Sequence, residues 1–485
     1  MKKLPVYILI IVLIALLPAC DDGFEEMNED PNNPTEVPTS YVLAGAQTKL
    51  MEELFGLYNE SSKWNLVGMR YMQFWTSTLY TDIDRYVTIE GDFTPVYYKG
   101  LRDLQELINL NSDPETAAQA AFSGPNQNQI AVARILKAYA FHNLSDIWGD
   151  IPYSQTLLGS ENVAPVYDPQ EQIYESLMQE LDEAYAQIEE SAGNIEGDLI
   201  YGGDVSQWKL FAQSLRLRLG MRLSEAKPAL AQAIVSDAIQ KGVFSSNAQN
   251  ATFAYNEQVP FVNPWYTEFH LETITLAVSN TMIDKLIALN DPRLAAFAER
   301  AEALGEYVGM PYGVNAAIAG SIKNEEVSLP ADQITEPTYP ALLQTYSEVL
   351  FLRAEAAARG WTGEDASQLY KDAIAASFEQ WGIAETELEA YLAQEELAFD
   401  TDNFKASIGN QKWLALYMQG MEAWAEWRRL DYPLLQPAPD AAAGRDIPRR
   451  RGYPLSEISL NQKNYEEAIA RQGPDLLSTP VWWDK

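Results

Sequence analysis

The sequence predicts a mainly α-helical fold, and three observations support this prediction. Apolar side chains recur at helical spacing in five long stretches, start and stop signals bound several of them, and small residues occupy positions where two helices would meet. The five stretches are 129–144, 171–188, 205–223, 342–359 and 365–381. Because 47% of the 485 residues are hydrophobic, the chain can bury a sizeable core.

The first three helices each show one apolar face. Val132, Ile135 and Tyr139 share a face in 129–144. Asp168 and Pro169 precede 171–188, as a cap and a first-turn proline do. In 205–223 the apolar set that includes Trp208 and Phe211 faces inward, and the basic residues occupy the other faces.

The last two helices form a predicted hairpin of the tetratricopeptide kind. Gly360 ends 342–359, and a short turn leads into 365–381. Small Ala354, Ala357 and Ala373 allow close approach of the two helices, and Tyr370 fills the gap between turns. Similar pairs are predicted for 129–190 and 205–241, although the spacing is not that of a regular array. Repeats of this type present surfaces to other proteins.

Long irregular segments separate these hairpins, at 61–100, 145–168, 243–282 and 305–340. Loops of this length in a compact chain are commonly functional. Aromatic residues, which make up 11% of the chain, gather in the first and third segments. These two segments are therefore the expected ligand-binding regions.

The N-terminus predicts a lipoprotein. Two lysines precede an apolar run at 6–17, which is too short for a membrane span, and small residues then precede Cys20, the only cysteine. We expect residues 1–19 to be a signal peptide and Cys20 to carry the lipid, palmitate included. An acidic, proline- and asparagine-rich tether follows at 20–39, before a single domain at 40–485. The alternative is an ordinary secretory signal with a coincidental cysteine.

Net charge and motifs exclude several functions. A net charge of −35 argues against nucleic acid or anionic lipid as the main partner. With two histidines, His142 and His270, a multi-histidine metal site is out of reach, and no nucleophile-elbow, zinc-protease or phosphate-loop motif occurs. His142 lies on a predicted helix and is interpreted as structural. No catalytic residue is assigned, and binding is favoured over catalysis.

The candidate binding residues come from the chemistry of sugar recognition. A pyranose ring stacks its apolar face on an aromatic ring, while its hydroxyls bind amide, carboxylate or guanidinium groups. Two clusters supply such mixtures, and for both the alternative is packing between loop and scaffold. The first cluster has Trp75, Tyr80, Asp82 and Arg85, together with Gln73; the second has Asn263, Trp265, Tyr266 and His270.

Segments spread along the chain resemble the SusD/RagB-like outer-membrane lipoproteins of Bacteroidetes. The acidic tether around 28–32 is similar to the start of that family, and 138–153 is similar to its first repeat helix and following loop. Further similar segments lie at 289–294, 347–356, 426–433, 447–454 and 481–484. They cover essentially the whole mature chain in the family's order.

The resemblance implies a fold and a role. It implies four tetratricopeptide-like helix pairs as a scaffold that docks on a SusC-like TonB-dependent outer-membrane barrel. It also implies a lid, held at the outer membrane and facing the cell exterior, that captures an oligosaccharide, or a peptide in some members, and needs no cofactor. A peptide ligand and a surface glycosidase remain as alternatives.

Overall fold

The structure is a computed structural model that describes residues 37–56 and 64–484. The expected signal peptide, Cys20 and most of the tether lie outside the described residues, as does the start of the 61–100 segment. Helices dominate the described chain, which confirms the predicted fold class. None of the described helices is long and apolar enough to cross a membrane.

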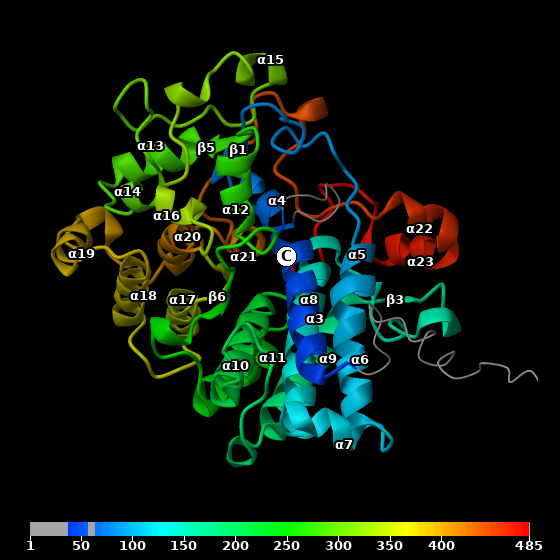
Figure 1. Cartoon of the computed structure of the whole chain (residues 1–485). Helices are drawn as coiled ribbons and strands as arrows, with labels where there is room; N and C mark the ends of the chain where they lie inside the picture. The colour runs from blue at the N-terminus through cyan, green and yellow to red at the C-terminus, as the bar shows by residue number, and fades with distance from the viewer. Residues whose placement is uncertain (1–36, 57–63, 485) are drawn as a thin grey trace, which may run out of the picture. The chain divides into compact units, whose positions relative to one another are not determined.

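The scaffold consists of four pairs of consecutive helices that pack along one another. In Figure 1, α8 to α11 lie in the lower half of the view, whereas α13, α15, β1 and β5 lie in the upper half. The pairs are α8 (Asn126–Trp148) with α9 (Gln170–Gln187), α10 (Val205–Arg222) with α11 (Pro228–Lys241), α17 (Tyr346–Ala358) with α18 (Ala366–Gln380), and α20 (Phe404–Ala415) with α21 (Gly420–Leu430).

Other helices cover this scaffold. The longer ones are α3 (Thr39–Phe55), α4 (Trp64–Tyr71), α6 (Arg102–Ser112), α13 (Asn280–Ala288), α19 (Glu385–Leu392) and α23 (Gln462–Gln472). The short α-helices are α5 (Thr94–Val96), α7 (Ala117–Ala120), α12 (Pro264–Tyr266), α14 (Leu294–Phe297), α15 (Ala316–Ala319), α16 (Asp332–Thr335) and α22 (Leu455–Leu460). Two π-helical turns, η1 (Tyr97–Leu101) and η6 (Thr267–Leu271), continue α5 and α12.

Three antiparallel two-stranded sheets tie distant segments together. Each sheet joins a loop to a segment far along the chain or to the next helix, so the sheets position loops and form no layer of their own. The pairs are β1 (Trp75–Ser77) with β5 (Leu276–Val278), β2 (Ile151–Pro152) with β3 (Tyr167–Asp168), and β4 (Ala251–Phe253) with β6 (Ala341–Gln344).

Two helix boundaries differ from the prediction by four residues, more than any other predicted boundary. Helix α8 continues to Trp148, beyond the predicted 144, because its polar residues are buried with partners: Asn143 donates to the Tyr139 carbonyl at 2.8 Å. The predicted helix 342–359 begins only at Tyr346, after strand β6. Thr345 caps it by accepting from the Glu348 amide. Adjacent leucines fit a buried strand as well as a helix, so periodicity does not separate the two.

Helix α4 was expected to be part of an irregular segment. All eight of its residues are buried, so it has no polar face that a periodic pattern could show. It packs on α21, where Gly68 lies against Gly420. The absence of a side chain at both positions lets the two helix backbones meet.

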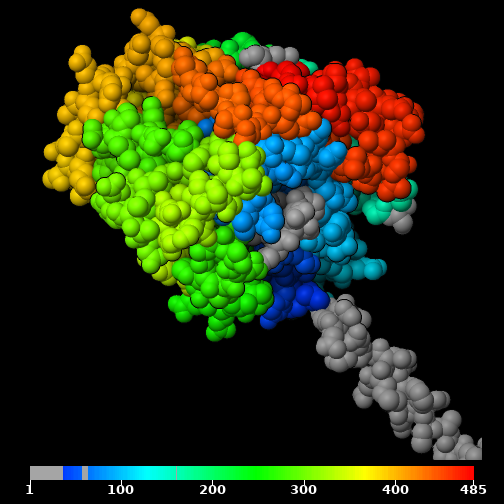
Figure 2. All heavy atoms as spheres, turned by 90° about the horizontal axis from the view of Figure 1, so that it is seen from above, coloured from blue at the N-terminus to red at the C-terminus, as the bar shows by residue number. Residues whose placement is uncertain are grey.

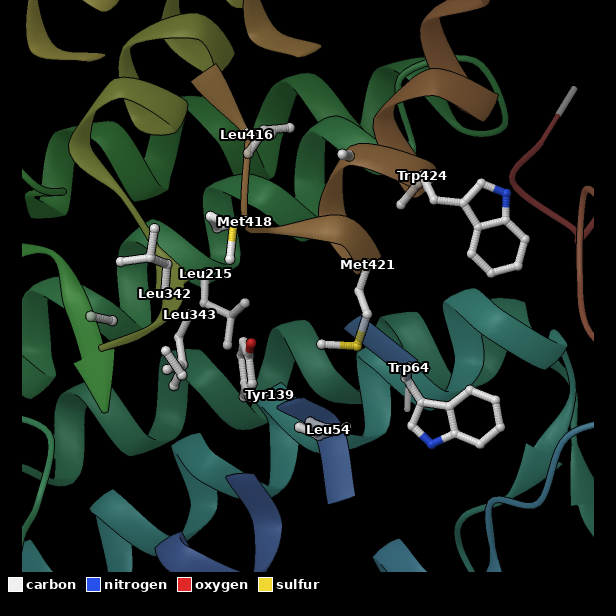
Figure 3. Packing of buried hydrophobic residues seen from close by; sticks show 14 of the residues in the cluster. Leu54, Trp64, Tyr139, Leu215, Leu342, Leu343, Leu416, Met418, Met421 and Trp424 are labelled. Atoms are coloured by element: carbon white, nitrogen blue, oxygen red, sulfur yellow. The ribbon is translucent and has the colours of Figure 1, made fainter. Parts of the chain in front are cut away.

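The core runs through the middle of the helix pairs. Figure 3 shows buried side chains from α3, α4, α8, α10, β6 and α21 converging on one another. Tyr139 from α8 and Leu215 from α10 lie near Leu342 and Leu343 from β6, while Met421 and Trp424 come from α21. Segments more than 300 residues apart in the chain therefore share one apolar interior.

A cluster of buried ion pairs crosses the same interior and links all four helix pairs. Glu426 accepts from Arg429 at 2.6 Å, from Lys412 at 2.7 Å, and from Arg222. Arg222 also binds Glu422 at 2.6 Å. Further pairs are Arg218 with Glu348 at 2.6 Å and Arg429 with Glu355 at 2.5 Å. Charges buried in this way must be matched, so the cluster fixes how the pairs pack.

His142 lies at the edge of this cluster. Burial lowers its pKa to about 4, even though Asp146 lies 3.4 Å from its Nδ1 and favours the charged form. Burial would raise the pKa of Asp146, but Arg222 and the hydrogen bond from His142 hold it down at about 2. The ring is therefore neutral near neutral pH, in agreement with its interpretation as a structural histidine.

Candidate functional site

A cavity of about 800 Å³ lies where the first and third irregular segments meet. Seen from above, the light blue segment 64–110 lies between the green and light green segment 250–340 and the red C-terminal segment (Figure 2). The cavity is lined by Trp64, Leu66, Val67, Arg70, Ser77, Tyr80, Asp82, Ile83, Thr88, Glu268, Glu272, Thr273, Thr275, Leu276 and Arg451. We call it the larger cavity.

Strand pairing brings its two main walls together. Ser77 in β1 pairs with Leu276 in β5, and the Thr78 amide donates to the Thr275 carbonyl at 2.8 Å. Glu268 accepts from the Thr275 amide at 2.8 Å and from its hydroxyl at 2.5 Å, which closes the loop between η6 and β5. Residues 200 positions apart in the sequence thus face the same space.

A buried ion pair supports the loop that carries Tyr80. Arg70 donates from Nε and Nη2 to the two carboxylate oxygens of Asp84, at 2.6 and 2.9 Å, and from Nη2 to the Tyr80 carbonyl at 2.6 Å. Burial alone would lower the pKa of Arg70, but Asp84 raises it overall, so the guanidinium stays charged. Ser77 accepts from the Tyr80 amide at 2.8 Å. The backbone of the loop is fixed while the Tyr80 ring remains exposed.

Two buried nitrogen donors in the wall have no acceptor among the described residues. Arg451 donates to the Tyr71 hydroxyl at 2.7 Å and to the Thr88 carbonyl at 2.9 Å, but its Nε has no partner there. The indole nitrogen of Trp64 also lacks one. Buried donors in folded proteins are normally hydrogen-bonded. The hydrogen-bonding capacity of this wall is therefore not fully used by the described residues.

The first predicted cluster is only partly at this cavity. Tyr80 and Asp82 line it, and both are exposed. Arg85 instead donates from Nε to the Asp440 carbonyl at 2.9 Å, which ties its loop to the C-terminal part of the chain. Gln73 is buried and donates to the Gln436 carbonyl at 2.6 Å.

The two tryptophans do come together, but they face inward. Trp75 is 0% exposed and Trp265 is 5% exposed, and their rings meet edge to face at 4.7 Å between centroids. The Trp75 indole donates to the Tyr417 hydroxyl at 2.6 Å. In this structure both rings are buried and pack between loop and scaffold, and neither has a face open to a sugar. Stacking of a sugar on these two rings stays an untested expectation.

The rest of the second cluster is structural or lies outside the larger cavity. Asn263 is buried and caps α12 by accepting from the Trp265 amide at 3.1 Å, so its side chain is engaged. Tyr266 and His270 stack obliquely at 5.0 Å between centroids, and His270 Nε2 lies 3.0 Å from the Thr335 hydroxyl. Neither of them lines the larger cavity.

Sequence reasoning missed most of the cavity wall. Glu272 and Thr273 follow η6 and are exposed, but exposed acidic and hydroxyl residues are too common in this chain to stand out. Trp64 and Arg451 could be assigned to the cavity only from the structure, because Trp64 lies in a helix that was not predicted, α4, and Arg451 lies near the C-terminus. The only signal was that Trp64 lies near the start of the first irregular segment, 61–100.

The larger cavity holds side chains that can bind a polar ligand with an apolar face. One exposed aromatic ring, Tyr80, lies in the same cavity as the carboxylates of Asp82 and Glu272 and the hydroxyl of Thr273. Within the described part of the chain, no three His, Cys, Asp or Glu side chains are grouped so that they could hold a metal ion.

Comparison with known families agrees with the fold. The model of SusD-like proteins, described as starch-binding and associating with the outer membrane, matches residues 31–454. The chain belongs to the SusD-like family. This confirms the resemblance seen in the sequence, and the family is one that associates with the outer membrane. A search of curated proteins returned no match.

Solved structures of SusD-like proteins superpose closely. A chitin-binding protein is 31% identical with a TM-score of 0.78, over 92% of this chain and 100% of that one. A SusD homologue from Bacteroides uniformis is 25% identical with a TM-score of 0.79, over 92% of this chain and 99% of that one. One from Bacteroides thetaiotaomicron is 25% identical with a TM-score of 0.77, over 93% and 99%.

Proposed function

We propose that this SusD-like protein captures an oligosaccharide in the larger cavity and acts as the lid of a SusC-like TonB-dependent barrel. The observation that carries the proposal is the placement of exposed Tyr80 beside Asp82 and Glu272 on a rigid loop frame. A flat ring with carboxylates around it suits a pyranose, whose apolar face stacks and whose hydroxyls donate. The size of the cavity, about 800 Å³, suits several sugar units.

Relatives named for starch and chitin binding support a glycan as the ligand class. The peptide alternative has no such support in the larger cavity.

The delivery role rests on the architecture and the sequence. We place the lipid on Cys20, so that the protein is held on the outer membrane, facing outward, and we assign barrel docking to the helical scaffold. In this role the protein binds and releases its ligand without a catalytic residue or cofactor. A glycosidase would instead shorten the glycan, which product analysis detects.

The test compares two tyrosines that are equally exposed, each at 71%. Calorimetry measures the affinity of the mature chain for starch and chitin oligosaccharides. Tyr80→Ala is expected to lose about 1–3 kcal/mol of binding free energy, as for a central aromatic contact, whereas Tyr41→Ala on α3 leaves affinity unchanged. Failure of all glycans to bind, or equal losses in both variants, contradicts the proposal.

A further inference from the structure

A second cavity, of about 610 Å³, shares no lining residue with the larger one. We call it the apolar cavity. It lies between α3, η1 and the segment from β4 to η6. Its lining residues are Thr48, Glu52, Glu53, Gly56, Lys99, Leu199, Phe253, Ala254, Tyr255, Asn256, Pro260, Phe261, Val262, Pro264 and Thr267.

The walls of the apolar cavity are aromatic and fixed in place. Phe253 belongs to β4 and pairs with Ala341 of β6. Phe253 and Tyr255 pack edge to face at 5.2 Å between centroids. The turn that carries Phe261 is closed by a hydrogen bond from the Asn256 amide to the Phe261 carbonyl at 2.9 Å. Phe261 is nevertheless 56% exposed, so an apolar surface remains uncovered at the mouth.

The charges at the opposite wall do not balance. Glu52 and Glu53 of α3 lie near Lys99, whose ammonium group donates to Glu53 Oε1, and near Lys49, which pairs with Asp103 at 2.7 Å. The other oxygen of Glu53 is buried and has no donor among the described residues. Burial raises the pKa of Glu52, and the neighbouring Glu53 raises it further, while Lys99 and Lys49 lower it. Because Lys99 is paired with Glu53 and Lys49 with Asp103, one carboxylate of this wall has no cation of its own.

An apolar chamber with one unmatched carboxylate selects a particular ligand. An ammonium group can donate to the carboxylates, and an aromatic body can pack against Phe253, Tyr255 and Phe261, with a cation–π contribution from the tyrosine ring. An anion would be repelled, and a neutral ligand would leave the charge unmatched. The volume of about 610 Å³ lies within the range of small-molecule sites.

We infer that the apolar cavity is a second binding site, for a small primary amine with an aromatic body, and that Glu53 and Glu52 bind its ammonium group. This site is separate from the proposed glycan site. It gives the protein a ligand class that differs from sugars in charge and in apolar area. The glycan proposal does not depend on it.

The test uses three probes with the same phenyl body and different charge. Calorimetry on the mature chain compares 2-phenylethylammonium, 2-phenylethanol and phenylacetate at neutral pH. The ammonium is expected to bind about tenfold or more tightly than the alcohol, as for a hydrogen bond to a buried charge, and phenylacetate is expected not to bind. Equal affinities for the ammonium and the alcohol, or no binding of the ammonium, overturn the inference.

Variants locate the binding to the cavity. Glu53→Gln is expected to remove the advantage of the ammonium over the alcohol, and Phe261→Ala to weaken both about fivefold. Because Glu53→Gln also breaks the pair with Lys99, Glu52→Gln at an exposed position is the companion variant, with an expected loss of about two- to fivefold for the ammonium only. Glu467→Gln, at an exposed position on α23 that lines neither cavity, should change nothing; if it weakens binding of the ammonium, or if neither Glu53→Gln nor Glu52→Gln does, the inference fails.

Discussion

Gly68 and Gly420 meet backbone to backbone where α4 packs on α21. A Cβ atom on Gly68 would lie 2.2 Å from the carbonyl oxygen of Gly420, and one on Gly420 would lie 2.1 Å from that of Asn65. Both are far shorter than a van der Waals contact, and each obstructing atom is in the backbone. This contact holds Trp64 and Arg70, which line the larger cavity, against the scaffold.

Gly68→Ala and Gly420→Ala are therefore expected to destabilise the protein by about 1–3 kcal/mol or more through overpacking. The matched control is Gly45→Ala in α3, where an added Cβ meets nothing within 4 Å. That change should stabilise the helix by about 0.5–1 kcal/mol. Denaturant unfolding of the three variants measures these differences, and equal stabilities would show that the helices can separate without cost.

The buried ion cluster predicts a large penalty for removing one charge. Glu426 contacts Arg222, Arg429 and Lys412, and these cations lower its pKa well below the ordinary value although burial alone would raise it. Glu426→Gln leaves the cations under-compensated and should cost about 3–5 kcal/mol. Lys463→Ala, which removes an exposed pair with Glu467 at 3.9 Å, should be neutral. A Glu426→Gln protein as stable as the wild type would mean that the cluster rearranges freely.

The buried His142 predicts a specific dependence of stability on pH. Burial lowers the pKa of His142 from 6.5 to about 4. Between pH 4 and pH 6.5, the ring is therefore protonated in the unfolded chain and neutral in the folded chain. Stability attributable to His142 is complete above pH 6.5 and falls as pH decreases toward 4, by about 1.4 kcal/mol per pH unit at most.

Comparison with His142→Gln isolates this effect. Carboxyl groups whose pKa is raised on folding, such as Glu422, increase stability as pH falls, but they do so in the wild type and in the variant alike. Urea unfolding from pH 7.5 to 4.5 should show the wild type losing stability relative to His142→Gln as pH falls. Parallel curves for wild type and His142→Gln would contradict a buried neutral ring.

The sequence predicted three of the four described helix pairs, those within 129–190, 205–241 and 342–381, because their apolar faces are read directly from spacing. Predictions for 171–188 and 205–223 match α9 and α10 to within one residue at each end. Helix α4 and strand β6 were missed for the same physical reason. Both are buried on every side, so their patterns lack the polar face that separates helix from strand.

The candidate site was predicted only in part. Tyr80 and Asp82 lie in the larger cavity, and the two irregular segments do meet there. Trp75 and Trp265 were chosen because tryptophan stacks on sugars, but tryptophan is also the largest core residue, and a single sequence does not separate these uses. The contribution of Arg451 depends on a contact between the two ends of the chain, which no local pattern encodes.

The anchor predicted at Cys20 is tested by fractionation. Cys20→Ser removes the acylated thiol, and each buried CH₂ of a lipid chain contributes about 0.8 kcal/mol to membrane affinity. The variant should be released from the outer membrane as a folded domain in a strain that lacks the partner barrel. Retention of the variant at the membrane of that strain would require a different anchor.

The inward-facing tryptophans give the last prediction. Trp75 is as fully buried as Trp208, at 0% exposure, and its indole nitrogen is bonded to Tyr417. Trp75→Ala should therefore cost about 3–5 kcal/mol through its cavity, as Trp208→Ala should, and lower the melting temperature by a similar amount. Tyr80→Ala should leave the melting temperature nearly unchanged, because its ring is exposed and buries little on folding. Thermal melts of the three variants test this prediction. A small decrease in the melting temperature of Trp75→Ala, together with a loss of glycan affinity, would instead indicate that Trp75 contacts the ligand.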